Sequence, residues 1–90
     1  MLEINENYYQ IICKDKILEL TPKEYDVLKL LIDNSYKVTS KLEIISELWP
    51  KVELNSRVVD TYISRIRKKL INLGHPGIRV QNKRGYRLIT

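Results

Sequence analysis

The stretch RVVDTYISRIRKKL, from Arg57 to Leu70, decides the fold of this chain. At roughly 100° per residue, its apolar side chains gather on one side of a helix, in a stripe that continues to Leu73. Polar and cationic side chains gather almost opposite, at Arg57, Thr61, Ser64, Arg65 and Lys68. We therefore predict a helix over about 56–73, with one face that needs a core and another that suits an anion.

The composition indicates one small domain with a basic surface. Ninety residues leave room for a single core, and 16 Lys and Arg against 11 Asp and Glu give a net charge of +5. This excess favours a polyanionic partner without separating DNA, RNA and anionic membranes. No apolar run approaches the roughly 18 residues of a membrane span, and no signal peptide is recognisable. Cys13 is the only cysteine, and we expect a buried or half-buried thiol in a reducing compartment.

The first 20 residues have the pattern of a small antiparallel meander. Short apolar runs between Leu2 and Leu20 alternate with Asn5-Glu6-Asn7 and Lys14-Asp15-Lys16, which have the composition of turns. Tyr and Ile between the turns favour strands, so this segment is expected to pack on the rest of the chain. The tyrosines predicted to pack inside are Tyr8, Tyr9, Tyr25 and Tyr86, whereas Tyr36 is expected to be a partly exposed loop residue.

Two helix starts come after the meander. Thr21-Pro22-Lys23-Glu24 combines an N-cap threonine, a proline at the first helical position and a glutamate at the third, and its helix runs to Asn34-Ser35. Ser40-Lys41-Leu42-Glu43 repeats the capping-box pattern and opens a shorter helix, which Pro50 ends. The buried stripe of the shorter helix is predicted to be Leu42, Ile45 and Leu48, with Ile44 and Trp49 beside them. Asn55 or Ser56 is predicted to cap the third helix, and Gly74 to end it.

The chain closes with a hairpin pattern. Ile78 and Val80 alternate with Arg79 and Gln81, and Tyr86 and Leu88 alternate with Arg87 and Ile89. The two runs flank Asn82-Lys83-Arg84-Gly85, which predicts a β-hairpin with a cationic tip. A capped helix, a second helix and a basic-tipped hairpin succeed one another in a winged helix-turn-helix. In that arrangement a rigid helix brings side chains to base edges, while flanking phosphate contacts fix its register.

Four segments in this order carry a more specific resemblance: LTPKEYDVLKLL, VTSKLEIISELW, SRVVDTYISRIRKKL and KRGYRL. Together they resemble the OmpR/PhoB-type effector domain, the DNA-binding output module of bacterial two-component response regulators. The resemblance covers essentially the whole of residues 1–90 as one domain. It implies an α+β winged helix-turn-helix with an N-terminal four-stranded antiparallel sheet, three helices and a C-terminal hairpin. The receiver domain of such regulators is absent from this chain.

The resemblance also implies how the domain acts. It implies binding to double-stranded promoter DNA, usually at direct repeats and as a head-to-tail pair with a second copy, in the bacterial cytoplasm. The third helix would lie in the major groove and the wing, residues 82–85, over the neighbouring minor groove. By position, Arg57, Tyr62 and Trp49 would lie near phosphates. Thr61, Ser64, Arg65 and Lys68 would face base edges or the adjacent backbone, with Arg67 at the flank.

Two segments depart from the family pattern. The loop of Lys51, Val52, Glu53, Leu54 and Asn55 corresponds to a segment that in this family can touch RNA polymerase, but it is shorter here than in many members. In the wing, family members often carry an Arg-Gly pair where this chain has Asn82 and Lys83, and that arginine enters the minor groove. Lys83 or Arg84 can take its place as a cation attracted to a narrow A·T-rich groove.

Simpler structural interpretations stand beside these roles. A charged run such as 65–69 is by itself typical of a solvated face, and Lys69, which lies off the centre of that face, is expected to be only solvated. Asp60 is expected to stabilise the first helical turn or to pair with a nearby arginine. Trp49 is more typical of a core residue than of a stacking platform. For Tyr62, partial core packing and a phosphate contact are equal alternatives.

The chain offers poor material for an enzyme or a metal site. His75 lies in a Gly-His-Pro-Gly turn without a second histidine or a nearby acidic cluster, and there is no glycine-rich phosphate loop. We expect no cofactor and no catalysis. The competing function is a winged-helix protein-interaction module without sequence-specific DNA binding, suggested by the apolar Val52 and Leu54. Nonspecific RNA binding is disfavoured, because we expect no exposed aromatic pairs for bases to stack on.

Overall fold

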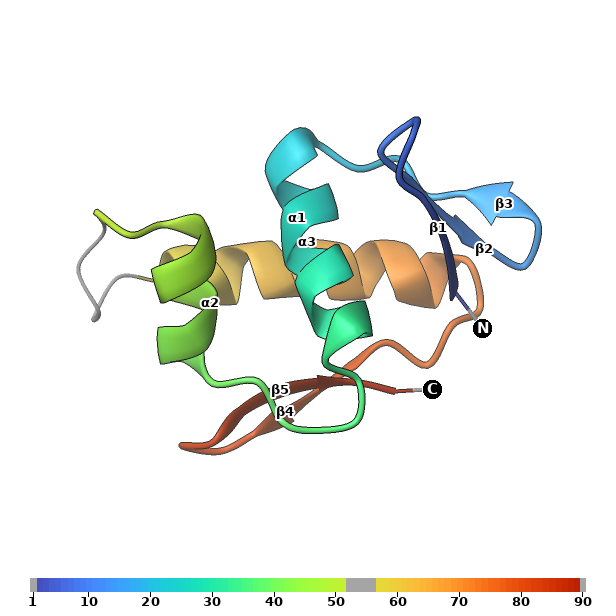
Figure 1. Cartoon of the computed structure of the whole chain (residues 1–90). Coiled ribbons are helices and arrows are strands. Elements are labelled where there is room, and N and C mark those ends of the chain that lie inside the picture. The colour runs from blue at the N-terminus through green and yellow to red at the C-terminus, as the bar shows by residue number, and fades with distance from the viewer. Residues whose placement is uncertain (1, 52–56, 90) are drawn as a thin grey trace.

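Three helices separate an N-terminal sheet from a C-terminal hairpin in the computed structural model, which describes residues 2–51 and 57–89 (Figure 1). The elements, in chain order, are β1 (Leu2–Asn5), β2 (Gln10–Cys13), β3 (Lys16–Ile17), α1 (Pro22–Asp33), α2 (Lys41–Leu48), α3 (Val58–Asn72), β4 (Ile78–Gln81) and β5 (Gly85–Leu88). This order confirms the predicted α+β winged-helix class.

The N-terminal sheet has the order β1-β2-β3 and is antiparallel throughout. Leu2 lies opposite Cys13, and Cys13 lies opposite Lys16. The resemblance implies four strands, which is wrong for the described residues, where this sheet has three. The backbone N–H of Leu18 donates to Ile11 at 2.9 Å, but the Leu18 side chain is buried in the core and Thr21 already caps α1. Residues 18–20 therefore lead from β3 to α1 without forming a further strand.

The turn between β1 and β2 is longer than predicted. It includes Tyr8 and Tyr9, which are each 73 % exposed, so the prediction that they pack inside is wrong. The Asn5 side chain accepts hydrogen bonds from the backbone of Asn7 and Tyr8, and this local turn carries both tyrosines away from the strand. The expectation that no aromatic pair is exposed is therefore wrong as well. Tyr25 is buried as predicted, while Tyr36 is 81 % exposed.

The first helix begins as the sequence predicts. Thr21 Oγ1 accepts from the backbone N–H of Glu24 at 3.3 Å, and Glu24 Oε1 accepts from the backbone N–H of Thr21 at 2.9 Å. This reciprocal pair is a complete capping box, with Pro22 at the first helical position. Asn34 occupies the C-cap position, as expected.

The cap of α2 is only half of the predicted box. Ser40 Oγ accepts from the backbone N–H of Glu43 at 3.1 Å, but the Glu43 carboxylate pairs with Lys37 Nζ at 2.6 Å. Ile44 and Ile45 are buried, whereas Leu42 is 55 % exposed, so its predicted place in the stripe is wrong. Leu42 lies roughly 200° around the helix from Ile44, and an eight-residue helix buries only one side.

The third helix is shorter than the predicted 56–73. Arg57 occupies the N-cap position, and among the described residues no side chain caps the first turn. The predicted caps Asn55 and Ser56 lie outside the described residues. At the other end, His75 N–H donates to Leu70 at 3.0 Å and Gly74 N–H donates to Ile71 at 2.9 Å. These two bonds form a Schellman motif, for which the positive φ of Gly74 (83°) is required.

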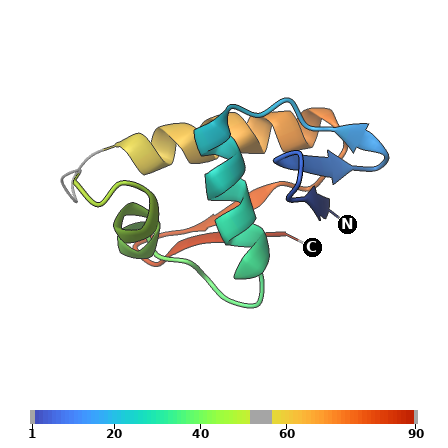
Figure 2. The same cartoon turned by 45° about the horizontal axis from the view of Figure 1, so that its top comes forward.

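The core lies where the three helices meet the two sheets. In both views α1 crosses α3, α2 lies beside the N-terminal half of α3, and the N-terminal sheet lies beside its C-terminal end (Figures 1 and 2). The predicted stripe of α3 is confirmed, with Leu73 only partly buried. The buried apolar residues are Ile11, Cys13, Leu18, Tyr25, Val27, Leu28, Leu31, Ile44, Ile45, Val59, Ile63, Ile66, Leu70, Ile78, Tyr86 and Leu88.

Candidate nucleic-acid interface

The exposed face of α3 carries the polar and cationic side chains that the sequence places there. Because Val59, Ile63, Ile66 and Leu70 are buried, the residues on the opposite side of the helix must face outward. Those that are exposed and aligned along this face are Arg57, Thr61, Ser64, Arg65 and Lys68. Thr61 Oγ1 also donates to the Arg57 carbonyl at 3.0 Å, which ties the first turn of α3 to its N-cap residue. The face can therefore offer cations and hydroxyl groups to an extended anion.

A row of rings and cations runs across the flank of α3. The rings of Trp49 and Tyr62 have centroids 5.2 Å apart, and both residues are partly buried against the core. The Arg65 guanidinium lies 5.5 Å from the Tyr62 ring, and Lys23 Nζ lies 5.2 Å from the Trp49 ring. Such cation–π contacts hold a flexible cation in place. The core-packing interpretation of both aromatic residues is supported, and their phosphate contacts stay predictions.

The wing is the hairpin of β4 and β5, whose register pairs Gln81 with Gly85. Its tip, with Lys83 and Arg84, is exposed as predicted. Arg84 N–H donates to the Gln81 carbonyl at 3.0 Å, and Lys83 adopts a positive φ of 61°. Lys83 therefore occupies a backbone conformation that glycine adopts more easily than lysine.

Gly85 lets the wing approach the segment before α2. Thr39 and Tyr86 exchange two backbone hydrogen bonds, at 2.8 and 2.9 Å. A Cβ atom on Gly85 would lie 2.2 Å from the Thr39 carbonyl oxygen. Thr39 is thus joined to β5 by a single β-bridge, and a side chain on Gly85 would break it.

Asp60 joins three elements between α3 and the wing. Its carboxylate accepts a hydrogen bond from the Tyr86 hydroxyl of β5, and its second oxygen lies 3.5 Å from Lys41 Nζ at the start of α2. The Tyr86 hydroxyl is the main reason that the pKa of Asp60 is lowered, with Lys41 and Arg57 contributing and burial opposing. Burial and the Asp60 carboxylate raise the pKa of Tyr86. Asp60 lies in the first turn of α3, as one of its two predicted roles requires. Its direct partners are Tyr86 and Lys41, and Arg57 acts on it only through its charge.

Two cations of the charged run 65–69 do not lie on the face of α3 that carries Arg65 and Lys68. Arg67 is exposed but points along the hairpin side of α3, where its Cγ lies 3.5 Å from the place a Cβ on Gly77 would take. Lys69 is not merely solvated, so that prediction is wrong. Its ammonium group donates to Glu24 Oε1 at 2.7 Å and to the Glu19 carbonyl at 2.6 Å. Lys69 therefore holds α3 against the first turn of α1.

The predicted polymerase-contact loop falls mostly outside the described residues. Lys51 is described and exposed, whereas Val52, Glu53, Leu54 and Asn55 are not described. His75 is buried, and its Nδ1 accepts from the backbone N–H of Gly77 at 2.8 Å. Over residues 2–51 and 57–89, no group of three acidic, histidine or cysteine side chains could hold a metal ion. Among the described helices, none is long and apolar enough to cross a membrane.

Asp60, Lys69 and Trp49 have partners across the fold that were not predicted from the sequence. Helical spacing contained part of the signal. Asp60 falls on the flank of α3 that turns toward the hairpin, and Tyr62 and Lys69 fall on the flank that turns toward α1 and α2. Spacing tells which flank a side chain occupies, but the partner comes from a distant element that spacing does not reveal.

A family model described as "Transcriptional regulatory protein, C terminal" matches residues 15–88. The chain is also 40 % identical over 72 residues to a probable transcriptional regulator ycf27 of Galdieria sulphuraria, a match that covers 77 % of this chain. The matched segment is 28 % of that regulator's length, so the chain corresponds to a minor part of it.

Two solved structures share the fold over nearly all of the chain. The DNA-binding domain of CpxR from E. coli superimposes with a TM-score of 0.84 at 28 % identity, covering 99 % of this chain and 90 % of that one. The DNA-binding domain of response regulator AdeR, in complex with an intercistronic region, gives 0.83 at 28 % identity, covering 97 % and 90 %. The chain belongs to the OmpR/PhoB-type family of winged-helix DNA-binding domains, the non-enzymatic output domains through which response regulators control transcription.

Proposed function

We propose that residues 1–90 form one domain that reads specific double-stranded promoter DNA, with α3 in the major groove and the wing at the neighbouring minor groove. One observation carries the proposal: the exposed face of α3 gathers Arg57, Thr61, Ser64, Arg65 and Lys68 beside a wing with a cationic tip. The AdeR domain, which shares the fold, is described in complex with DNA. Because promoter DNA is the proposed ligand, the proposed place of action is the bacterial cytoplasm.

The proposed roles divide between base edges and the phosphate backbone. Arg65 is held over the Tyr62 ring, so its guanidinium is already partly ordered before it meets a guanine edge. Thr61, Ser64 and Lys68 share that face and are assigned to base edges or the adjacent backbone. The side chains assigned to the phosphate strands are Arg57, Tyr62, Trp49 and Arg67, whereas Lys83 and Arg84 of the wing are assigned to the minor groove.

Selection from random duplexes tests this function. The wild-type domain should enrich one sequence, and Arg65→Ala should lower discrimination among its single-base variants by about 1–3 kcal/mol. Lys16→Ala is the matched control, because Lys16 is an exposed cation of β3, which lies away from the N-terminal half of α3 and from the wing tip. It should leave discrimination unchanged. Equal binding to every duplex at physiological salt would instead favour the protein-interaction module.

Two partner proposals rest on the family resemblance. A second copy is proposed to bind head to tail on direct repeats, and a gel-shift titration should show two steps on a duplex with two half-sites but one step on a single half-site. RNA polymerase is proposed to touch residues 51–55. Lys51, which is exposed in the turn that follows α2, supports this placement, and Lys51→Ala should lower transcription in vitro without changing DNA affinity.

A further inference from the structure

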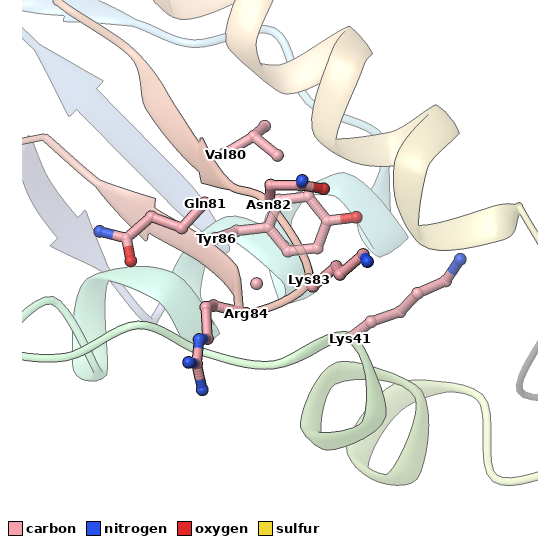
Figure 3. Close-up of a pocket in the computed structure, with 8 residues that line it drawn as sticks. Lys41, Val80, Gln81, Asn82, Lys83, Arg84 and Tyr86 are labelled. Carbon is pink, nitrogen blue, oxygen red and sulfur yellow. The ribbon is translucent and has the colours of Figure 1, made fainter.

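The Asp60 carboxylate lies at the meeting point of the elements that the proposed function brings to DNA. It lies in the first turn of α3, accepts from the Tyr86 hydroxyl of β5 and faces Lys41 of α2. Figure 3 shows the Tyr86 ring and the Lys41 side chain both directed toward α3, from the wing and from the start of α2. One carboxylate therefore links α3, the proposed recognition helix, with both the wing and α2.

Tyr86 is held at both of its ends. Its backbone exchanges two hydrogen bonds with Thr39, and its ring is buried with only 7 % of the residue exposed. A buried tyrosine hydroxyl needs a partner, and here the partner is a carboxylate on α3 rather than water. The Tyr86 ring packs β5 against the core, and its hydroxyl forms a directional hydrogen bond between the wing and the recognition helix.

We propose that Asp60 and Tyr86 are positioning residues that set the distance between the base pairs under α3 and the base pairs under the wing. This inference rests on the proposed function. Adjacent grooves are separated by a phosphate strand, so a protein that reads both must hold its two reading elements at a fixed offset. The Asp60–Tyr86 hydrogen bond fixes that offset at the end of α3 nearest the wing tip.

The charge of Asp60 supports a positioning role over a simple affinity role. Asp60 is exposed, between Lys41 and Arg57, on a helix that otherwise presents cations. A negative charge near a phosphate strand opposes binding, so this carboxylate weakens the electrostatic attraction that the rest of the helix provides. Its contribution to DNA recognition therefore comes from what it holds in place.

The experiment compares two duplexes. One carries the sequence enriched by the wild-type domain, and the other carries the same sequence with one base pair inserted between the segments that α3 and the wing protect in a footprint. The wild-type domain should prefer the first duplex by about tenfold, the effect of one mismatched base pair. In Tyr86→Phe and in Asp60→Ala, the ratio of the affinities for the two duplexes should fall close to one. Discrimination among base changes under α3 should persist in both variants.

Asp60→Asn is the conservative control, because its amide oxygen still accepts from Tyr86. It should keep the preference near tenfold although the charge is gone. Lys83→Ala should weaken binding to both duplexes alike. Thermal unfolding of each variant shows whether it is folded at the assay temperature, and if Tyr86→Phe is not, the comparison of Asp60→Ala with Asp60→Asn decides.

A preference that stays near tenfold in folded Tyr86→Phe or Asp60→Ala overturns the positioning role and leaves the proposed function intact. An Asp60→Asn variant that loses the preference also overturns it, since the charge would then be responsible. Failure of the proposed function gives a different result, because the wild-type domain would then enrich no duplex at all.

Discussion

Lys69 of α3 donates a hydrogen bond to the Glu24 carboxylate of α1 at 2.7 Å, across 45 residues of sequence. The Glu24 side chain is only 3 % exposed, and the same carboxylate closes the capping box of α1. Lys69 belongs to the charged run of the recognition helix. Its ammonium group nevertheless compensates the buried charge of Glu24 inside the fold.

Replacing Lys69 with Met should destabilise the domain without affecting its choice of DNA sequence. The substitution leaves the Glu24 carboxylate buried without its cation, which costs about 1–3 kcal/mol. The free energy of unfolding from urea titration measures the effect. Lys68→Met is the matched control, since Lys68 is the exposed neighbour, and it should change stability by less than about 0.5 kcal/mol. Equal effects of the two substitutions would contradict a structural role for Lys69.

Stability should fall in acid through Glu24. Burial raises the pKa of this carboxyl, but hydrogen bonds from Lys69 and Thr21 outweigh burial and lower it below the ordinary value of 4.5. The unfolded chain then binds the proton more readily, so the stabilisation is complete well above pH 4.5 and is lost as the pH falls through the folded-state pKa. Urea titrations at a series of pH values should show a shallower acid loss in Glu24→Gln than in the wild type.

His75 should also destabilise the fold as the pH falls, and this loss should begin at a higher pH than the loss through Glu24. Burial lowers its pKa below 6.5, with Lys14 contributing. Neutral His75 therefore stabilises the fold fully above pH 6.5, and this contribution decreases as the pH falls from 6.5 through the folded-state pKa. His75→Asn keeps an acceptor for the Gly77 N–H but cannot titrate. The stability difference between pH 7.5 and 5.5 should be smaller in this variant, and an unchanged difference would rule His75 out.

Lys83→Gly should stabilise the wing while it weakens DNA binding. Glycine adopts the positive φ of this position without steric strain, so the free energy of unfolding should rise by about 0.5–1 kcal/mol. Loss of the ammonium group should reduce the slope of log K against log salt by about 0.9 if Lys83 contacts one phosphate. Lys83→Ala separates the two effects, because it loses the charge and keeps the strain. An unchanged salt slope in both variants would place Lys83 away from the DNA.

Gly85→Ala should detach the wing from the segment before α2. Its Cβ would lie 2.2 Å from the Thr39 carbonyl oxygen, and the positive φ of 141° adds strain, for a cost of about 2–4 kcal/mol. Gly77→Ala is the matched control, with a positive φ but an ordinary nearest contact of 3.5 Å. Amide hydrogen exchange at Thr39 and Tyr86 should accelerate in the first variant only.

Local signals predicted the elements of this fold well. The Thr21 cap, the proline after α2, the Gly74 stop and the alternation of the hairpin each act within a few residues, and each is confirmed. Tyr8 and Leu42 were mispredicted because burial depends on what lies across from a side chain, and hydrophobic character alone does not supply a neighbour.

The candidate interface divides in the same way. The exposed face of α3 can be predicted from helical period, because its opposite face is fixed by a strong apolar stripe. The roles of Asp60 and Lys69 cannot be predicted from helical period, because each depends on a residue at least 26 positions away in the sequence. Side chains at the edge of a stripe are those whose surroundings the tertiary structure decides.

The ring pair of Trp49 and Tyr62 gives the domain a built-in optical probe. Trp49 is the only tryptophan of the chain, and it lies where α1, α2 and α3 meet, with a lysine near one ring and an arginine near the other. Indole emission depends on nearby charges and on access to water, and both change when a polyanion covers α3 or when the helices separate. Intrinsic fluorescence therefore reports duplex binding and unfolding from the same residue, without a label.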